Sequence, residues 1–427
     1  MKRRSFLTGS FFTAAGLTAL PFSNVSAASG ENPSKPRRLV DSFPVLQVPA
    51  ETSIGVVWAV NDVSTGWVEI STQKDLSNPR KVFCGGLKVR ALEKRLLNAR
   101  ITGLKPATRY YYRTYTQAFD AKNCYATKPV GEPVRSAVYS FTTLGCAADA
   151  SFAVINDTHE HLDTFQKLIE KIDRLDPSVM VWNGDICNQI YSIDSAIGYL
   201  VRPKGLPYAV SRPILYTPGN HDYRGFESRQ LSQIMLPRAP EERDARFAGL
   251  DRNFAVRLGD LALIGLDTGE DKPDRHPVWA GLANYEPYRA LQTEWLKEAL
   301  ERPEIKSAPY LVAFCHIPLY DDAPDANPGD ILEGYASWQR PCSRMWSPLF
   351  KKHHLSALIT AHQHCFRSFA PTADRPWLQL IGGGPKLTPS EAATVIHGRV
   401  VGGELKIGVH DLASNKLVQT FTIRPRV

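Results

Sequence analysis

The stretch ILYTPGNHDY, residues 214–223, decides the fold of this chain. Its apolar run, ILYT, ends at a Pro-Gly turn, and Asn220, His221 and Asp222 follow in direct succession. Polar side chains directly after a buried strand are typical of a functional loop at the carboxyl end of that strand. One such cluster also fits a plain surface loop, so the fold depends on whether other strands end in the same way.

Four more apolar runs after residue 145 end in Asp, Asn or His. The runs are SFAVI (151–155), SVMVW (178–182), YLVAF (310–314) and SALIT (356–360). The polar blocks after them are Asn156-Asp157-Thr158-His159, Asn183-Gly184-Asp185, Cys315-His316 and Ala361-His362-Gln363-His364. Two segments with helical spacing, TFQKLIEKIDRL and TEWLKEALE, lie between these strands. We therefore predict an α/β region in which five strand ends together form a site.

The residue types in these blocks indicate metal ions. Imidazoles, carboxylates and one amide, with no thiolate at the matching positions, suit Mn, Fe, Zn or similar ions. One ion rarely needs two Asp, one Asn and four His, so we expect two ions bridged by a carboxylate about 3.5–4 Å apart. A single one of these histidines would more often be a partly buried structural residue. Five strand ends in register favour the metal site.

Residues 39–145 have the pattern of an all-β region. TSIGVVWAV, TGWVEIST and RKVFCGGL are short β-branched and aromatic runs separated by turn residues. RITGLKPATRYYYRTYT then resembles a fibronectin type III domain, whose Leu-x-Pro-x-Thr-x-Tyr pattern is matched by Leu104, Pro106, Thr108 and Tyr110. We predict a small β-sandwich here, with its tyrosines used for packing and a tyrosine corner. One disulfide among Cys84, Cys124 and Cys146 is also expected.

The blocks DxH, GDxxN, GNHD, a single His and HxH resemble the calcineurin-like metallophosphoesterases. With the preceding sandwich, Leu266-Asp267-Thr268-Gly269 and Gln292-x-x-Trp295-Leu296 resemble the purple acid phosphatase-type branch. The resemblance implies a four-layer α-β-β-α sandwich over residues 146–427. It implies two divalent or trivalent ions, whose identity (Mn, Fe or Zn) it leaves open. Their ligands would be Asp157, His159, Asp185 and His364 for the first, and Asp185, Asn220, His316 and His362 for the second, with Asp185 as the bridge.

The same resemblance implies hydrolysis of phosphate esters by a metal-bound hydroxide. We expect His221 to donate a proton to the leaving oxygen and Asp222 to orient it. Arg224 and Arg367 are candidate contacts for the substrate phosphate. Purple acid phosphatases carry a tyrosine ligand where this chain has Asn188, so the protein is expected to be colourless.

The first residues, MKRRSFLTGSFFTAAGLTALPFSNVSAASG, resemble a twin-arginine export signal. Basic residues precede a moderately apolar segment that ends at Val25-Ser26-Ala27, a small-residue cleavage pattern. We expect a signal at 1–27, a linker at 28–38 and a periplasmic or secreted protein. An uncleaved anchor is the alternative, and no other segment is expected to enter a membrane.

Function is predicted only at the level of reaction class. A phosphatase or phosphodiesterase acting on a small phosphorylated substrate fits best. A non-catalytic metal-binding surface or adhesion protein and a nuclease of the same fold are the alternatives. A net charge of +8 without a long basic stripe gives no indication of nucleic acid. Two loops, 223–251 and 319–349, are expected to cover the site and to set specificity.

Overall fold

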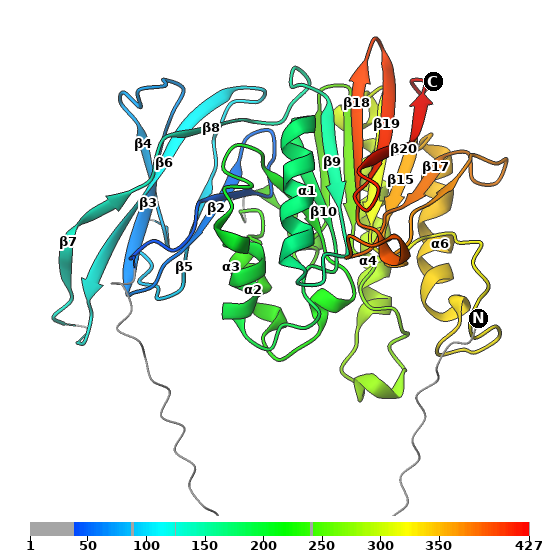
Figure 1. Cartoon of the computed structure of the whole chain (residues 1–427), viewed down its shortest axis with the longest axis horizontal. Helices are drawn as coiled ribbons and strands as arrows, with labels where there is room; N and C mark the ends of the chain where they lie inside the picture. The colour runs from blue at the N-terminus through cyan, green and yellow to red at the C-terminus, as the bar shows by residue number, and fades with distance from the viewer. Residues whose placement is uncertain (1–37, 87–88, 124, 240–241, 427) are drawn as a thin grey trace, which may run out of the picture. The chain divides into compact units, whose positions relative to one another are not determined.

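The computed structural model describes residues 38–86, 89–123, 125–239 and 242–426. These residues belong to one compact unit (Figure 1). The predicted signal, 1–27, and nearly all of the predicted linker, 28–38, lie outside the described residues. Within the described ranges, none of the helices combines the length and the apolar character needed to span a bilayer.

The described residues between 38 and 145 form strands and no helices, as the sequence predicts for 39–145. They are β1 (Val45–Gln47), β2 (Ile54–Ala59), β3 (Ser64–Ser71), β4 (Arg80–Phe83), β5 (Leu96–Ile101), β6 (Arg109–Asp120), β7 (Lys128–Arg135) and β8 (Tyr139–Thr142).

Strands and helices alternate over most of the remaining chain. The strands are β9 (Ser151–Ile155), β10 (Val179–Asn183), β11 (Ile214–Thr217), β12 (Phe254–Leu258), β13 (Leu261–Leu266), β14 (Tyr310–Cys315), β15 (Ala357–Thr360), β16 (Arg367–Phe369), β17 (Leu378–Ile381), β18 (Thr394–Val401), β19 (Glu404–Asp411) and β20 (Lys416–Ile423). The α-helices are α1 (Leu162–Leu175), α2 (Ile193–Leu200), α3 (Leu231–Ile234), α4 (Tyr285–Glu301), α5 (Pro303–Lys306) and α6 (Tyr335–Lys352).

Two sheets pack face to face at the centre of this region. The first runs β20-β19-β18-β9-β10-β11-β1-β2-β5, and the second runs β12-β13-β14-β15-β17-β16. Phe152 and Val181 of the first sheet share one buried cluster with Val312, Phe314 and Ile359 of the second. Apolar side chains on both faces of these strands explain their continuous hydrophobic sequences.

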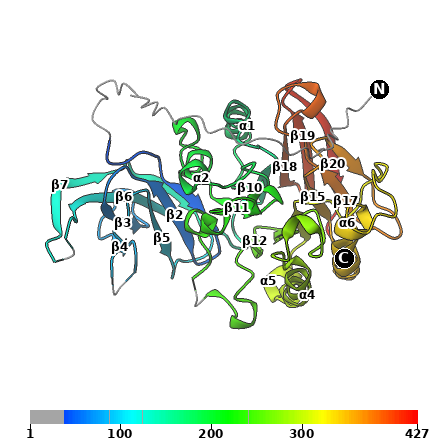
Figure 2. The same ribbon diagram turned by 90° about the horizontal axis from the view of Figure 1, so that it is seen from below.

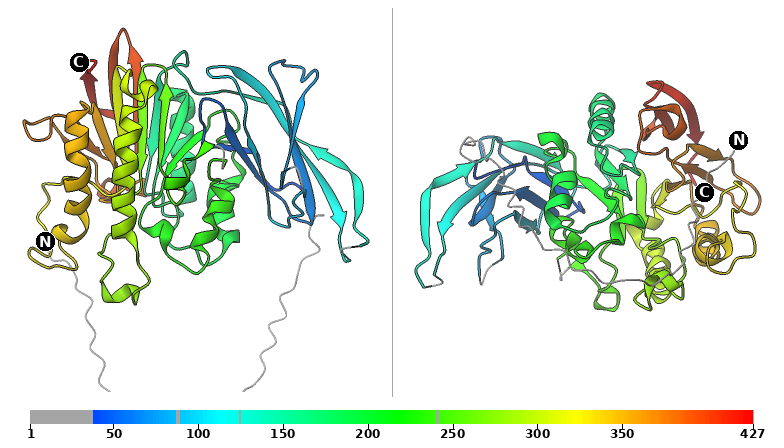
Figure 3. Two further views of the ribbon diagram at one scale, coloured as in Figure 1. Left: turned by 180° about the vertical axis from the view of Figure 1, so that it is seen from behind. Right: turned by 60° about the horizontal axis from the view of Figure 1, so that its bottom comes forward.

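Helices cover the outer face of each sheet. Phe165 and Leu168 of α1 pack with Trp182 on the first sheet. On the second sheet, α4 and α6 supply the apolar cover, including Leu296 and Trp346. Figure 2 shows α1 on one side of the central strands and α4 on the other, and Figure 3 shows α4 and α6 from behind. The order helix, sheet, sheet, helix is the predicted four-layer α-β-β-α sandwich.

The N-terminal strands divide between two sheets. Strands β1, β2 and β5 extend the nine-stranded sheet, because β1 pairs in parallel with β11. A five-stranded sheet, β4-β3-β6-β7 with β8 beside β6, packs against them through Val56, Trp58, Ile70 and Tyr112. The assignment to the fibronectin type III family and the boundary at 145/146 stay predictions.

Two local predictions in the N-terminal region have different outcomes. The backbone N–H of Lys105 donates to the Tyr110 hydroxyl at 2.9 Å, which is the predicted tyrosine-corner contact. Cys84 and Cys146 are both free, so these two do not form the expected disulfide, and Cys124 lies outside the described residues. The six cysteines in the described ranges are all unpaired.

Candidate metal centre

The seven predicted ligand residues meet at the carboxyl ends of five strands. In the first sheet, β9 is followed by Asp157 and His159, β10 is followed by Asp185, and β11 is followed by Asn220. In the second sheet, β14 is followed by His316, and β15 is followed by His362 and His364. Because the strands of each sheet are parallel here, their ends lie at one edge, and the packed sheets bring the two edges together.

The donor atoms form two groups that share one carboxylate. Asp157, His159, Asp185 and His364 form the first group, and Asp185, His316 and His362 form the second. Ligand atoms within each group lie within 4.8 Å of one another. An Asp185 oxygen, Oδ2, lies 3.4 Å from His159 Nε2 in the first group and 3.2 Å from His316 Nε2 in the second. The buried amide of Asn220 joins the second group, where its Oδ1 is 3.1 Å from His362 Nδ1.

Two atoms at the centre of these groups are buried without a hydrogen-bond partner among the described residues. Asp157 Oδ2 accepts from Asn156 Nδ2 at 2.7 Å and from the backbone N–H of His362 at 3.0 Å. Asp157 Oδ1 accepts nothing, and His316 Nε2, 3.7 Å away, is likewise unsatisfied. A buried charged oxygen without a partner is costly, and a cation between these atoms would satisfy both. The donor set therefore fits metal ions.

Hydrogen bonds behind the imidazoles fix which nitrogen faces the centre. His316 Nδ1 lies 2.9 Å from the Asn183 carbonyl oxygen, and His159 Nδ1 lies 3.0 Å from the amide oxygen of Asn188. Because these oxygens only accept, each Nδ1 carries a proton, and Nε2 is the nitrogen left to face a metal ion. This outer-shell arrangement is typical of metal-ligating histidines.

The backbone at the candidate ligands adopts an uncommon conformation. Five of the seven residues have a positive φ between 42° and 72°. They are Asp157, His159, Asp185, His362 and His364. This left-handed conformation costs a residue with a side chain about 1–2 kcal/mol. Such strain clusters at functional sites, where the surrounding structure holds side chains in positions that regular strands cannot provide.

Two glycines allow the loops of the site to approach closely. A Cβ on Gly184 would lie 2.4 Å from His316 Nδ1, and a Cβ on Gly219 would lie 2.1 Å from Asp185 Oδ1. A side chain at either position would displace a candidate ligand. The glycines of the GDxxN and GNHD blocks are thus required by the packing of the donors themselves.

The electrostatics of the cluster favour a cation. Burial opposes protonation of His316, but Asp185 and Asp157 outweigh it and raise the pKa of His316 to about 10. Burial and the adjacent His316 lower the pKa of His362 to about 4. Burial acts to raise the pKa of Asp185, yet the surrounding imidazoles, His316 first, hold it well below its usual value. The carboxylates thus stay ionised and draw positive charge to the centre.

His221 and Asp222 face different partners, and the expected contact between them is not formed. His221 Nδ1 lies 2.9 Å from the Asn188 carbonyl oxygen, and Arg224 Nη1 lies 3.1 Å from His221 Nε2. The Asp222 carboxylate is buried and accepts hydrogen bonds from five donors. These are the backbone N–H groups of Asp185, Ile186, Cys187 and Gly219 and the hydroxyl of Tyr216. The prediction that Asp222 orients His221 is therefore wrong.

The reason lies in the local backbone. Residues 221–223 form a single 3₁₀ turn, in which consecutive side chains point about 120° apart. His221 is consequently directed toward the candidate metal centre, and Asp222 is directed into the core. There Asp222 fixes the loop that carries Asp185.

The two predicted phosphate contacts are both paired with carboxylates. Arg224 forms a forked pair with the buried Glu270, at 3.0 Å and 2.9 Å, and a longer one with Asp271 at 3.2 Å. Arg367 pairs with Asp321 at 2.5 Å. Contact of either arginine with substrate stays a prediction, and the orientation of Arg224 toward His221 was not predicted.

Comparison with known proteins agrees with this geometry. Residues 150–366 match the calcineurin-like phosphoesterase family. Probable purple acid phosphatase 20 of Arabidopsis thaliana is 23% identical over 273 residues, which cover 62% of this chain and 54% of that protein. Purple acid phosphatase PPD1 from yellow lupin (Lupinus luteus) seeds shares the fold with a TM-score of 0.64 and 15% identity, over 90% of this chain and 74% of the lupin chain.

The chain belongs to the calcineurin-like phosphoesterase family. The match covers half of its length and includes the polar blocks from Asp157 to His364. The chain spans about half of the Arabidopsis relative. Asn188, which stands where the resemblance gives purple acid phosphatases a tyrosine ligand, accepts a hydrogen bond from His159 Nδ1.

Other residues of the phosphoesterase site were not predicted from the sequence. Asn156 holds both Asp157 and the Gly383 carbonyl oxygen, and a Cβ on Gly382 would collide with it at 2.0 Å. Trp338 of α6 packs edge-on against the His362 ring, with centroids 5.5 Å apart. Trp338 belongs to the 319–349 segment that was expected to cover the site. Asn156 directly precedes the DxH block, and that adjacency was the one available signal for it.

Proposed function

We propose that this protein is an exported metal-dependent hydrolase of phosphate esters with a two-ion centre. The supporting observation is the convergence of two donor groups on Asp185, with the buried Asp157 Oδ1 and His316 Nε2 unsatisfied between them. One isolated ion would leave part of this donor set unused. The ions, when bound, would activate water and neutralise phosphoryl oxygens. Export rests on the sequence of residues 1–27 alone.

The ligand assignment is part of the proposal. Asp157, His159, Asp185 and His364 would hold one ion. Asp185, Asn220, His316 and His362 would hold the other. We also retain the proposed division into a fibronectin type III-like sandwich at 39–145 and a phosphoesterase domain at 146–427.

His221 is the proposed proton donor to the leaving oxygen. Its Nδ1 donates to the Asn188 carbonyl oxygen, so Nε2 is the atom that faces the reaction. Arg224 Nη1 occupies that atom in the structure. A phosphoryl oxygen is a stronger acceptor than an imidazole nitrogen, so bound substrate would draw Nη1 away, and Nε2 would then take up from solvent the proton that it gives to the leaving oxygen. We propose that Asp222 acts indirectly, by holding the loop of Asp185.

Assaying a panel of phosphate esters would identify the class of substrate. Aryl and alkyl monoesters, a diester, a nucleotide and single-stranded DNA should be compared with the metal-loaded protein and with the same protein after chelation. Hydrolysis that chelation abolishes and added metal restores is the expected result. Preference for the diester or DNA would indicate the phosphodiesterase or nuclease alternative. No hydrolysis of any ester by metal-loaded protein would contradict the proposal and favour a non-catalytic metal-binding protein.

A further inference from the structure

A second group of unsatisfied buried polar atoms lies in a cavity that shares no residue with the candidate metal centre. The cavity lies between Arg238, residues 242–253 and the C-terminal end of α4. Its volume is about 60 Å³. A site for one water needs about 10–15 Å³, so the cavity has room for several heavy atoms.

Every carboxylate in the cavity wall already has a guanidinium partner. The three pairs are Arg100–Glu242, Arg243–Asp251 and Arg246–Asp244. The acidic side chains of the wall are therefore neutralised by other arginines. They leave the remaining cations of the cavity without an ion-pair partner among the described residues, although the charges of Asp244 and Glu242 still act on them.

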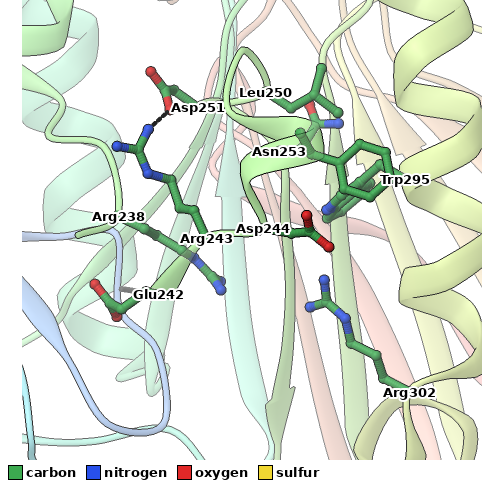
Figure 4. Close-up of a pocket in the computed structure, with 10 residues that line it drawn as sticks. Arg238, Glu242, Arg243, Asp244, Leu250, Asp251, Asn253, Trp295 and Arg302 are labelled. Carbon is green, nitrogen blue, oxygen red and sulfur yellow. Dashed lines mark hydrogen bonds and ion pairs between the residues drawn. The ribbon is translucent and has the colours of Figure 1, made fainter. Parts of the chain in front are cut away.

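Those remaining cations are Arg238 and Arg302. Neither forms an ion pair with a described carboxylate. Arg238 Nε and Nη2 are buried, and neither has a hydrogen-bond partner among the described residues. Burial, and then the nearby charge of Arg100, lower the pKa of Arg238, although the charges of Glu51 and Glu242 oppose this shift. Figure 4 shows the guanidinium group of Arg302 next to the Asp244 carboxylate, and the guanidinium group of Arg238 on the facing wall.

Asn253 completes the cavity with a neutral donor and acceptor. This residue is 8% exposed, and both its Nδ2 and its Oδ1 are buried without partners. The Trp295 ring closes the same wall, 5.9 Å from the guanidinium carbon of Arg302. A buried amide that satisfies neither atom is rare in native structures, and it indicates a missing partner.

We propose that this cavity is a binding site for a phosphate group that retains a P–OH, with inorganic phosphate as the ligand. Its oxyanion oxygens would accept from Arg238, Arg302 and Asn253 Nδ2, and the two guanidiniums would neutralise its charge. Its P–OH would donate to Asn253 Oδ1, which no fully deprotonated anion can do. The site would respond to the released product of the proposed reaction without taking part in the chemistry.

Phosphate binding to the metal-loaded protein tests the site directly. Equilibrium dialysis with labelled inorganic phosphate should count one more phosphate per chain in wild type than in Arg238→Met or Asn253→Leu. Where residual binding is seen, affinity should be about tenfold to a hundredfold weaker, because hydrogen bonds to charged groups are lost. Lys297→Met removes one exposed positive charge from α4 outside the cavity, and should bind as wild type does.

The two cavity variants should keep their metal content and their turnover, which separates this site from the proposed active centre. Equal phosphate counts and affinities in wild type, Arg238→Met and Asn253→Leu would overturn the proposal. Because Asn253→Leu removes no charge, its loss of phosphate cannot be a general electrostatic effect.

Competition identifies the chemistry of the ligand. Sulfate, which carries no proton at neutral pH, should displace labelled phosphate at least about tenfold less well than unlabelled phosphate. Methylphosphonate keeps a P–OH and is not hydrolysed, so its displacement of the label would show that a terminal phosphate group suffices, and its failure would restrict the site to free phosphate. Sulfate competing as well as phosphate would contradict the role given to Asn253.

Discussion

The candidate metal centre and the cavity lined by Arg238, Asn253 and Arg302 are two sites in one chain that would bind ligands of opposite charge. In the first, Asp157 Oδ1 and His316 Nε2 lack partners, and the surrounding carboxylates attract a cation. In the second, Arg238 and Asn253 lack partners among the described residues, and the proposed ligand of the guanidiniums is an anion. Both conclusions come from the same question, namely which buried polar atom has no hydrogen-bond partner.

The sites differ in how they are held. The metal donors follow parallel strands, and backbone pairing in two packed sheets fixes their positions. The cavity is built from a loop and a helix end whose positions depend on ion pairs such as Arg100–Glu242. Sheet-supported sites are rigid before the ligand arrives, whereas the cavity depends on side chains that surround it. Changes at the metal centre should therefore have large functional effects, and changes at the cavity should have smaller ones.

The largest expected effect follows Asp185→Asn. The proposed shells share this carboxylate, so bound metal should fall well below the wild-type amount and turnover should fall on the order of a thousandfold or more, because metal catalysis contributes several kcal/mol. Metal analysis and steady-state kinetics on one preparation measure both. Asp163→Asn, the same change at an exposed residue of α1, is the control and should behave as wild type. Full metal content and activity in Asp185→Asn would remove the bridging role.

His221→Ala should keep its metal and lose on the order of a hundredfold in rate, the usual contribution of a general acid. The loss should be much greater for an alkyl phosphate than for nitrophenyl phosphate, since a nitrophenolate leaving group needs little protonation. Steady-state rates on the two esters give the ratio. Equal losses would instead indicate stabilisation of phosphoryl charge, and loss of metal would make His221 a ligand.

Asn188→Ala should weaken metal binding by about tenfold to a hundredfold, the usual cost of removing an outer-shell partner. The reason is that His159 Nδ1 loses its acceptor, so the ring and its tautomer are no longer fixed. Titration against a competing chelator measures the affinity. Asn188→Asp keeps an acceptor oxygen and should retain binding; unchanged affinity in Asn188→Ala would show that the contact is not needed.

The smallest effect is expected at the cavity. In phosphate-free buffer, Arg238→Met should raise the thermal midpoint by about 1–3 °C, because an unpaired buried charge is replaced by an apolar side chain. Arg100→Met should lower the midpoint, since it leaves the partly buried Glu242 without its partner. Calorimetry of both variants sharpens the comparison. A lower midpoint in Arg238→Met would mean that the guanidinium is satisfied in the phosphate-free protein.

The sequence predicted that the candidate ligands lie together, because the signal for their positions is local. Each ligand follows directly after a continuous apolar strand, so the strand pattern itself brings Asp157, Asp185 and His316 to one edge of the fold. The helices TFQKLIEKIDRL and TEWLKEALE were predicted for a similar reason, because their apolar residues recur at helical spacing within a short stretch of sequence. In the structure they lie within α1 and α4.

The sequence did not predict features that depend on the direction of a side chain or that join residues far apart in the chain. Asp222 follows His221, but a 3₁₀ turn separates their side chains, and adjacency in sequence gave the wrong contact. Arg238, Asn253 and Arg302 form one cavity although no periodic pattern links them. The positive φ values of the candidate ligands are also invisible in the sequence, because non-glycine residues adopt them only when the surrounding structure imposes them.

The central claim is that Asp185 joins two metal shells in one site. Elemental analysis of active wild-type protein, expressed as ions per chain, tests it most directly. We expect about two ions per chain, as a bridged pair requires. Fewer than one ion per fully active chain would contradict it, because the donors of both groups could not then be occupied together.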